Sequence, residues 1–186
     1  MDISTWLVAE LDDSVLRLTK QVLELIPADR RRERFPGGNS IDWATFHIAR
    51  HASLALRVAG HDPAMSDALL AGLDPAVTAP AAGLHEVQQP LLELIETPEL
   101  EAYALSVMDE TRAYLSHLDA ATLDIVPDVA TGLRAAGIDE AEFGWLYSLW
   151  ASSPGFLARW PMIGHVTNHV GEMIATRNQM GLSPFR

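Results

Sequence analysis

Apolar residues recur at helical spacing in the first part of the chain, between Ser4 and Ile26. Steps of three and four residues between apolar positions are typical of one face of an α-helix. The stripe consists of Leu11, Val15, Leu18, Val22 and Leu25. Ser4 or Thr5 can cap the start of this helix and Pro27 ends it. The pattern therefore predicts a first long helix over these residues.

Two further long helices have clear boundary signals. Ser40 precedes the segment IDWATFHIARHASLALRVAG, which stops at Gly60, a residue type suited to a helix C-terminus. Thr97 and Pro98 mark another start, because threonine caps helices and proline is favoured in the first helical turn. One apolar face then follows, made of Leu100, Tyr103, Val107, Thr111, Tyr114 and Leu118.

A last long helix ends near Gly181, and its start has two possible positions. It runs either from Pro154 with a kink or from Pro161 without one, since proline disrupts a helix interior. A short helix is expected before it, over about residues 143–151.

The connections between these helices are long. Residues 61–96 contain four prolines and several small residues, and we expect short helical turns near residues 66–71 and 85–95. A second irregular and acidic stretch covers residues 119–142. Strand-like alternation is nearly absent. The fold class predicted is all-α: a four-helix bundle with a long crossover between the second and third long helices, plus short extra helices, in one domain over residues 1–186.

Composition excludes several classes of protein. The formal net charge is −12 and there is no cysteine, so a broad cationic nucleic-acid surface, disulfides and thiolate sites are not expected. No apolar run approaches the roughly 20 residues that span a bilayer, and the acidic N-terminus is unlike a signal peptide. We therefore expect a cytoplasmic protein that binds neither nucleic acid nor membranes. The arginine cluster in ADRRRERF is interpreted as a solvated loop.

Three histidines stand out against this apolar background. His165 and His169 are four residues apart, so they lie about 40° apart on one face of the last helix. That helix is apolar almost all round, which is typical of a buried helix. His47 follows Trp43 by one turn on the second helix and precedes Leu54 by two, so it shares their inward stripe.

Imidazoles from two neighbouring helices can converge on one divalent metal ion. Three protein ligands leave coordination positions open, which is typical of catalytic zinc sites. Histidine pairs at this spacing also arise by chance, and each of the three could hydrogen-bond separately. His51 forms a second pair with His47 in HIARH. It is the alternative third ligand, or else an outer partner, a polar group of the pocket or a surface residue.

Two charged residues lie near the predicted site. Glu172 shares the face of His165 and His169, where it could accept a hydrogen bond from a ligating imidazole or act as a general base. A salt bridge with Arg177 or Arg50 is the alternative. Arg50, between the two histidines of its helix, could bind a substrate carboxylate. Glu172 and Arg50 are thus the candidate catalytic residues.

These motifs resemble the DinB-like (DinB/YfiT) superfamily of metalloenzymes. SIDWATFHIARHASLAL is similar to that family's second helix, where a Trp precedes a metal-binding His, and HVTNHVGEMIATRNQMG to its last helix. The two motifs cover about 35 residues. The resemblance puts the family's metal ligands on His47, His165 and His169. In the mycothiol-dependent maleylpyruvate isomerase branch the first position of the last helix is commonly Glu, a departure from His165 here.

The resemblance implies a zinc- or nickel-dependent enzyme that forms a homodimer. It also implies a thiol-dependent transferase, using a low-molecular-weight thiol such as mycothiol or bacillithiol, or a hydrolase acting on a small molecule. The crossover at residues 61–96 would cover that substrate. The alternative function is a non-catalytic ligand-binding or interaction protein built on the same helices.

Overall fold

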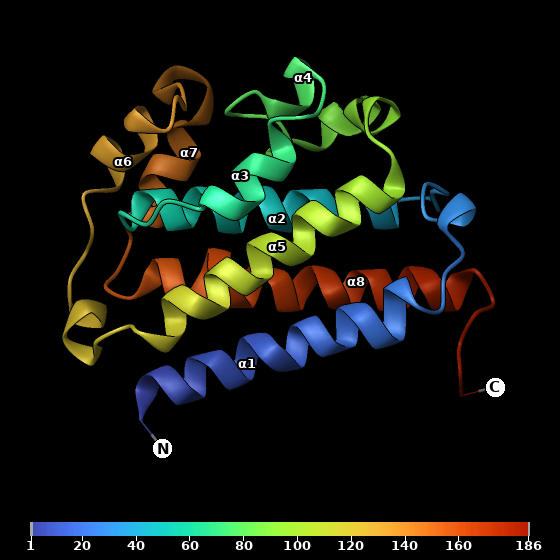
Figure 1. Ribbon diagram of the computed structural model, residues 1–186, viewed down its shortest axis with the longest axis horizontal. Helices are drawn as coiled ribbons and strands as arrows, with labels where there is room; N and C mark the ends of the chain where they lie inside the picture. Colours follow the sequence, from blue (N-terminus) through green and yellow to red (C-terminus); the bar gives the residue numbers. More distant parts are fainter. Residues whose placement is uncertain (1, 186) are drawn as a thin grey trace.

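Residues 2–185 are described by the structure, a computed structural model (Figure 1), and within this part of the chain there are helices but no strand. The long helices are α1 (Ile3–Leu18), α2 (Ile41–Val58), α5 (Thr97–Ser116) and α8 (His165–Gln179). The shorter ones are α3 (Ala64–Leu70), α4 (Pro75–Thr78), α6 (Val129–Ala135) and α7 (Glu140–Trp150). None of the described helices is long and apolar enough to cross a membrane.

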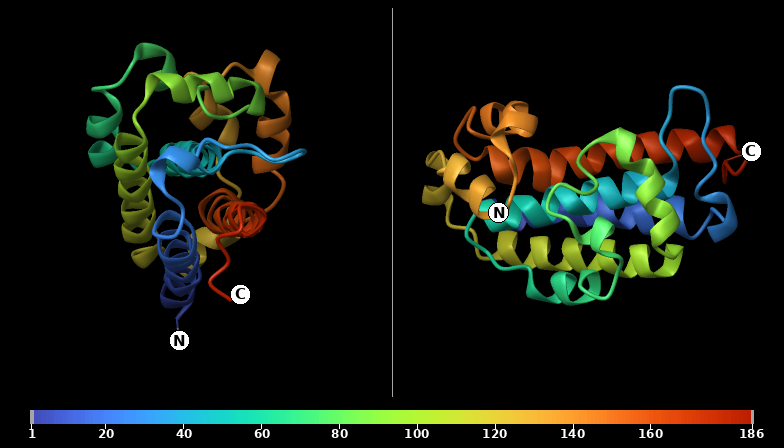
Figure 2. Two further views of the ribbon diagram at one scale, coloured as in Figure 1. Left: turned by 90° about the vertical axis from the view of Figure 1, so that its right-hand side faces the viewer. Right: turned by 90° about the horizontal axis from the view of Figure 1, so that it is seen from above.

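The four long helices pack on one another along most of their length. α2 contacts α5 and α8, and α1 contacts the same two helices from the other side. Figure 2 (left) shows them nearly end-on, with α3, α4, α6 and α7 on the side of α2 that is opposite α1. This arrangement encloses α2, so almost all of its residues are buried, including Trp43, Phe46 and Ile48.

The ends of α2 follow the predicted signals. The Ser40 side chain accepts a hydrogen bond from the Trp43 amide, and Gly60 takes a positive φ of 80° just beyond the helix. The third long helix begins one residue differently from the prediction. Glu96 is its N-cap, while Thr97 lies in the first turn and donates from Oγ1 to the buried Asp42, 2.7 Å away.

Both outer long helices contain a π-helical segment that the spacing did not predict. The first helix continues from α1 into Thr19–Leu23, and this wider turn shifts the buried face so that Ile26, rather than the predicted Leu25, is fully buried. In the last helix, helical structure starts at Phe156 and passes through a π segment over Ala158–Gly164 that contains Pro161. The start near Pro154 is therefore the closer of the two predicted alternatives.

The two helical turns predicted within residues 61–96 are present, as α3 and as a 3₁₀ segment over Glu86–Leu94. The connections also contain helices that were not predicted: α4, and α6 in the acidic stretch 119–142. The interpretation of the arginine cluster as a solvated loop is wrong for Arg31. Its guanidinium is buried, donates to the carbonyls of Leu23 and Ile26, and pairs with Glu101. The carbonyls that end the first helix are satisfied in this way.

Candidate metal centre

His47 extends from the middle of α2 towards α8. Its ring stacks on Trp43, one turn earlier, at a centroid distance of 5.9 Å. Its Nδ1 lies 2.7 Å from the carbonyl oxygen of Gly83 in the crossover. Because a carbonyl only accepts hydrogen bonds, Nδ1 carries the proton and Nε2 keeps its lone pair. The crossover thereby leaves Nε2 free to bind a cation.

His165 and His169 project from adjacent turns of α8. Their Nε2 atoms are 3.1 Å apart, and their rings are nearly perpendicular, at 87°. Nδ1 of His169 donates to Oε2 of Glu172 at 2.7 Å, so the lone pair of this ring is also on Nε2. The carboxylate thus fixes the orientation of His169 as the crossover fixes that of His47.

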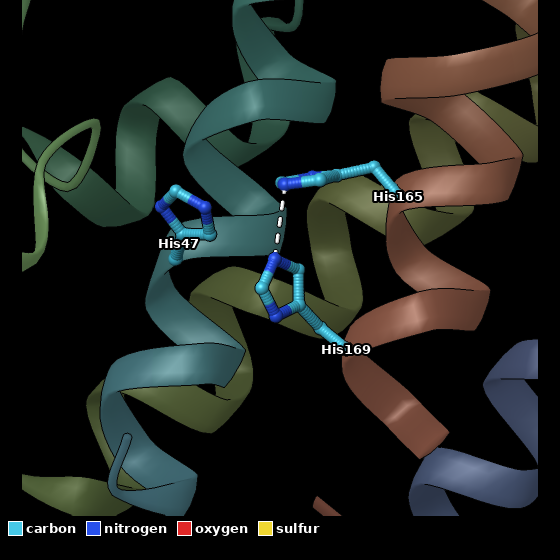
Figure 3. Close-up of side chains that lie close together, drawn as sticks. All are labelled: His47, His165 and His169. Atoms are coloured by element: carbon cyan, nitrogen blue, oxygen red, sulfur yellow. Dashed lines mark hydrogen bonds between the residues drawn. The ribbon is translucent and has the colours of Figure 1, made fainter. Parts of the chain in front are cut away.

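The three predicted histidines converge. One nitrogen from each of His47, His165 and His169 can be chosen so that all three lie within 4.8 Å of one another. Figure 3 shows a nitrogen of His47 facing the two histidines of α8 while its other nitrogen points away from them. Nitrogens that share one zinc ion at about 2.0–2.1 Å are roughly 3–4 Å apart. The donor set therefore fits a divalent metal ion after small ring movements.

Burial keeps His47 and His165 neutral, the form of imidazole that binds metals. Burial lowers the pKa of His47 to about 4, against the opposing effect of its hydrogen bond to Gly83. Burial, together with the neighbouring histidines, lowers the pKa of His165 to about 2. Two rings with these pKa values are uncharged at neutral pH, so protons compete little with a metal ion for their nitrogens.

His51 is a buried neighbour of this cluster. It is 5% exposed, and its ring centroid is 4.5 Å from those of His47 and His165. The surface role kept open for this residue is therefore wrong. Burial also lowers the pKa of His51 well below its usual value. His51 is not among the three residues whose nitrogens meet within 4.8 Å.

Arg50, on α2, binds the main chain of the crossover and forms no ion pair among the described residues. Arg50 is 9% exposed as a residue, and its guanidinium donates to the carbonyl oxygens of Ala79, Pro80 and Ala82. These contacts hold the same loop whose next residue, Gly83, orients His47. The contacts of Arg50 support a structural role, and its binding of a substrate carboxylate stays a prediction.

Glu172 makes the predicted hydrogen bond to a candidate ligand. Its second oxygen accepts from Nδ2 of Asn168 at 3.0 Å. The alternative salt bridge is not formed, because Arg177 is buried and donates to the carbonyl of Gln21 and to Asn178, while Arg50 binds the crossover. Both carboxylate oxygens are engaged in holding α8 side chains in place.

Gly83 has a role in the site that no sequence pattern predicted. An added Cβ there would lie 2.6 Å from Cγ of Arg50 and 2.9 Å from Cε1 of Phe46, and φ is +82°. Only glycine brings the backbone this close to α2 in this conformation. The functional atom is a main-chain carbonyl, so no side-chain pattern could reveal it. A glycine inside a proline-rich crossover was the one available signal.

No protein-family model, curated protein or solved structure matches the chain. The three converging imidazoles and their partners are therefore the basis on which function can be inferred.

Proposed function

We propose that this protein binds one divalent metal ion through His47, His165 and His169, and that it is a metal-dependent enzyme. The convergence of three ring nitrogens from two helices carries this proposal. Two of the rings are held by outer partners that force their lone pairs toward one another. Such outer hydrogen bonds are typical of metal-ligating histidines.

Zinc or nickel is the ion that suits this site best. Imidazole is a ligand for both ions, and a set of three leaves coordination positions for another molecule. When bound, such an ion acts as a Lewis acid that polarises a donor atom of the substrate. The chain's own contribution is to exclude water around His165, orient His47 through Gly83 and orient His169 through Glu172.

A hollow of about 340 Å³ next to Glu172 supports binding of a small molecule. Its lining includes Glu86, Glu172 and Asn39, and none of the described residues that line it is lysine or arginine. A neutral polar or cationic substrate fits this lining better than a carboxylate. None of the three histidines lines this hollow, so we propose that the substrate binds between residues 36–39 and α8 and reaches the metal ion past Glu172.

The reaction class proposed is transfer or hydrolysis on a small molecule, with a low-molecular-weight thiol as a possible co-substrate. The resemblance of the two histidine segments to the DinB-like superfamily supports this class. It also supports the description of α1, α2, α5 and α8 as a four-helix bundle with a crossover. The homodimer implied by the same resemblance stays a prediction, which sedimentation equilibrium would test.

Metal quantitation tests the proposal directly. Protein purified without a nickel column should contain about one equivalent of zinc or nickel per chain. His169→Ala should lose this metal, because it removes one of three ligands. His117→Ala is the matched control, since His117 is exposed and bonds only within its own turn and to Ser116. A wild-type protein that neither contains nor takes up divalent metal would contradict the proposal.

Turnover separates the enzyme from a non-catalytic binding protein on the same helices. Metal-loaded protein should act on electrophilic small molecules in a screen with and without low-molecular-weight thiols. If replacing the three histidines together abolishes that activity and leaves the melting temperature within a few degrees, the metal is catalytic. A large loss of stability with no measurable chemistry in the wild type would instead favour a structural metal.

A further inference from the structure

The three candidate ligands differ in the partner of their outer ring nitrogen. Nδ1 of His47 donates to a carbonyl and Nδ1 of His169 donates to a carboxylate, each at 2.7 Å. Nδ1 of His165 is buried and has no hydrogen-bond partner. A neutral imidazole that binds a cation through Nε2 carries its proton on Nδ1. A buried N–H without an acceptor costs about 1–3 kcal/mol.

A second buried nitrogen without a partner lies on the neighbouring ring. Nε2 of His51 is buried and makes no hydrogen bond, and the His51 and His165 ring centroids are 4.5 Å apart. Trp145 and Trp150 lie on other sides of His51, with centroid distances of 6.4 and 6.1 Å. Neither indole N–H donates to Nε2 of His51, and His47, whose ring is equally close, already gives its Nδ1 hydrogen bond to Gly83. His165 is therefore the polar ring best placed to pair with His51.

We infer that His51 is the outer partner of His165: its Nε2 accepts a hydrogen bond from Nδ1–H of His165, directly or through one water molecule, when the three imidazoles hold a cation. His51 is then a positioning residue and not a fourth ligand. This inference rests on the proposed metal site. It gives every candidate ligand one outer acceptor: the Gly83 carbonyl, the Glu172 carboxylate and the His51 imidazole.

The position of His51 explains why a polar residue is kept in this part of the core. His51 follows His47 by one helical turn. Helix α2 therefore directs the His47 ring to the cation and the His51 ring to the Nδ1 side of His165. Leucine at this position would fill the space but would leave Nδ1 of His165 without an acceptor. The cost would appear in metal binding, because only the metal-loaded site requires the proton on Nδ1.

Zinc affinity of His51 variants, measured by competition with a chelator, tests this role. His51→Leu should weaken zinc binding 10- to 100-fold, the range typical of a lost outer partner. His51→Gln, which retains an acceptor oxygen, should stay within about threefold of the wild type. His61→Leu is the control, because His61 lies beyond the end of α2 against Tyr114 and should leave affinity unchanged.

Two spectroscopic readouts distinguish positioning from ligation. In the zinc-loaded protein, nitrogen NMR of the imidazoles should show a slowly exchanging Nδ1 proton on His165 that is lost in His51→Leu. The visible spectrum of the Co²⁺-loaded protein should be the same in wild type and His51→Gln. Unchanged affinity and an unchanged His165 proton in His51→Leu would overturn the inference while leaving the metal site intact. A changed Co²⁺ spectrum in His51→Gln would make His51 a ligand, and a wild type that binds no metal would overturn both proposals.

Discussion

The two halves of the candidate metal centre are organised differently. On α8, both histidines and the Glu172 carboxylate lie on successive turns of one helix, so ordinary helical spacing places them on one face. On α2, His47 is oriented by a carbonyl 36 residues further along the chain. The first half can form wherever the helix forms. The second half requires the crossover to be in place, so the crossover is where the site is most sensitive to mutation.

The largest effect is expected from removing the crossover's anchor on α2. Arg50→Met should lower the free energy of unfolding by about 5 kcal/mol, because hydrogen bonds to a charged group contribute at least about 1.5 kcal/mol each and this guanidinium makes three to the crossover. Urea unfolding of the metal-free protein would measure the change. Arg134→Met is the control and should cost less than about 1 kcal/mol, since Arg134 and Glu140 form an exposed pair. Equal effects would show that the crossover is not held by Arg50.

A smaller loss is expected from Gly83→Ala. The new Cβ would meet Arg50 and Phe46 at under 3.0 Å in a left-handed conformation, so we expect about 3 kcal/mol of destabilisation and weaker zinc binding through His47. Gly60→Ala distinguishes the cost of the close contacts from the cost of the left-handed conformation. Gly60 has nearly the same φ, +80°, but nothing within 4 Å of an added Cβ, and should lose only about 1 kcal/mol. If Gly83→Ala loses stability but not zinc affinity, the crossover does not orient His47 for metal binding.

Acid should destabilise the metal-free protein through both halves. The folded-state pKa values of His47 and His165, about 4 and about 2, lie below the ordinary value of 6.5. The unfolded chain therefore takes up protons first as the pH falls, and stability that is complete above pH 6.5 is lost below it. Each of these two rings should contribute about 1 kcal/mol of loss between pH 6.5 and 5.5, or about 2 kcal/mol together. His51 should add to this loss, because burial also lowers its pKa well below the ordinary value.

Urea unfolding at these two pH values, after chelation of metal, would measure this loss. His165→Asn should reduce it by about 1 kcal/mol, and His47→Asn by a similar amount. A stability that does not change between pH 6.5 and 5.5 would mean that these rings are not kept neutral by burial.

The smallest effect is expected on the α8 side. Glu172→Ala should weaken zinc binding about 10-fold, or about 1.4 kcal/mol, because water can replace an acceptor whose side chain is 53% exposed. The free energy of unfolding should change little. Glu142→Ala, an exposed carboxylate on α7, is the control for loss of negative charge. A loss of affinity greater than that of Gly83→Ala would reverse the proposed difference between the two halves.

Helical spacing was sufficient to predict much of this molecule. The stripes of α1 and α5, the caps of α2 and the shared face of His165 and His169 depend on contacts within a few residues, which the sequence states directly. The π-helical turns were missed, because an extra residue in a turn is stabilised by tertiary packing and not by a local motif. The same reason explains why Ile26 replaces Leu25 in the core.

The sequence by itself determined that the chain is helical, approximately where its long helices lie, and that three histidines occupy inward faces. Only the tertiary structure decided that their nitrogens meet, that Arg50 holds the crossover, and that the ring centroids of His51 and His165 lie 4.5 Å apart. Helix faces are set by a periodicity of 3.6 residues, which any reader of the sequence can apply. Convergence is set by how two helices and a long loop pack, and that depends on contacts between residues far apart in the chain.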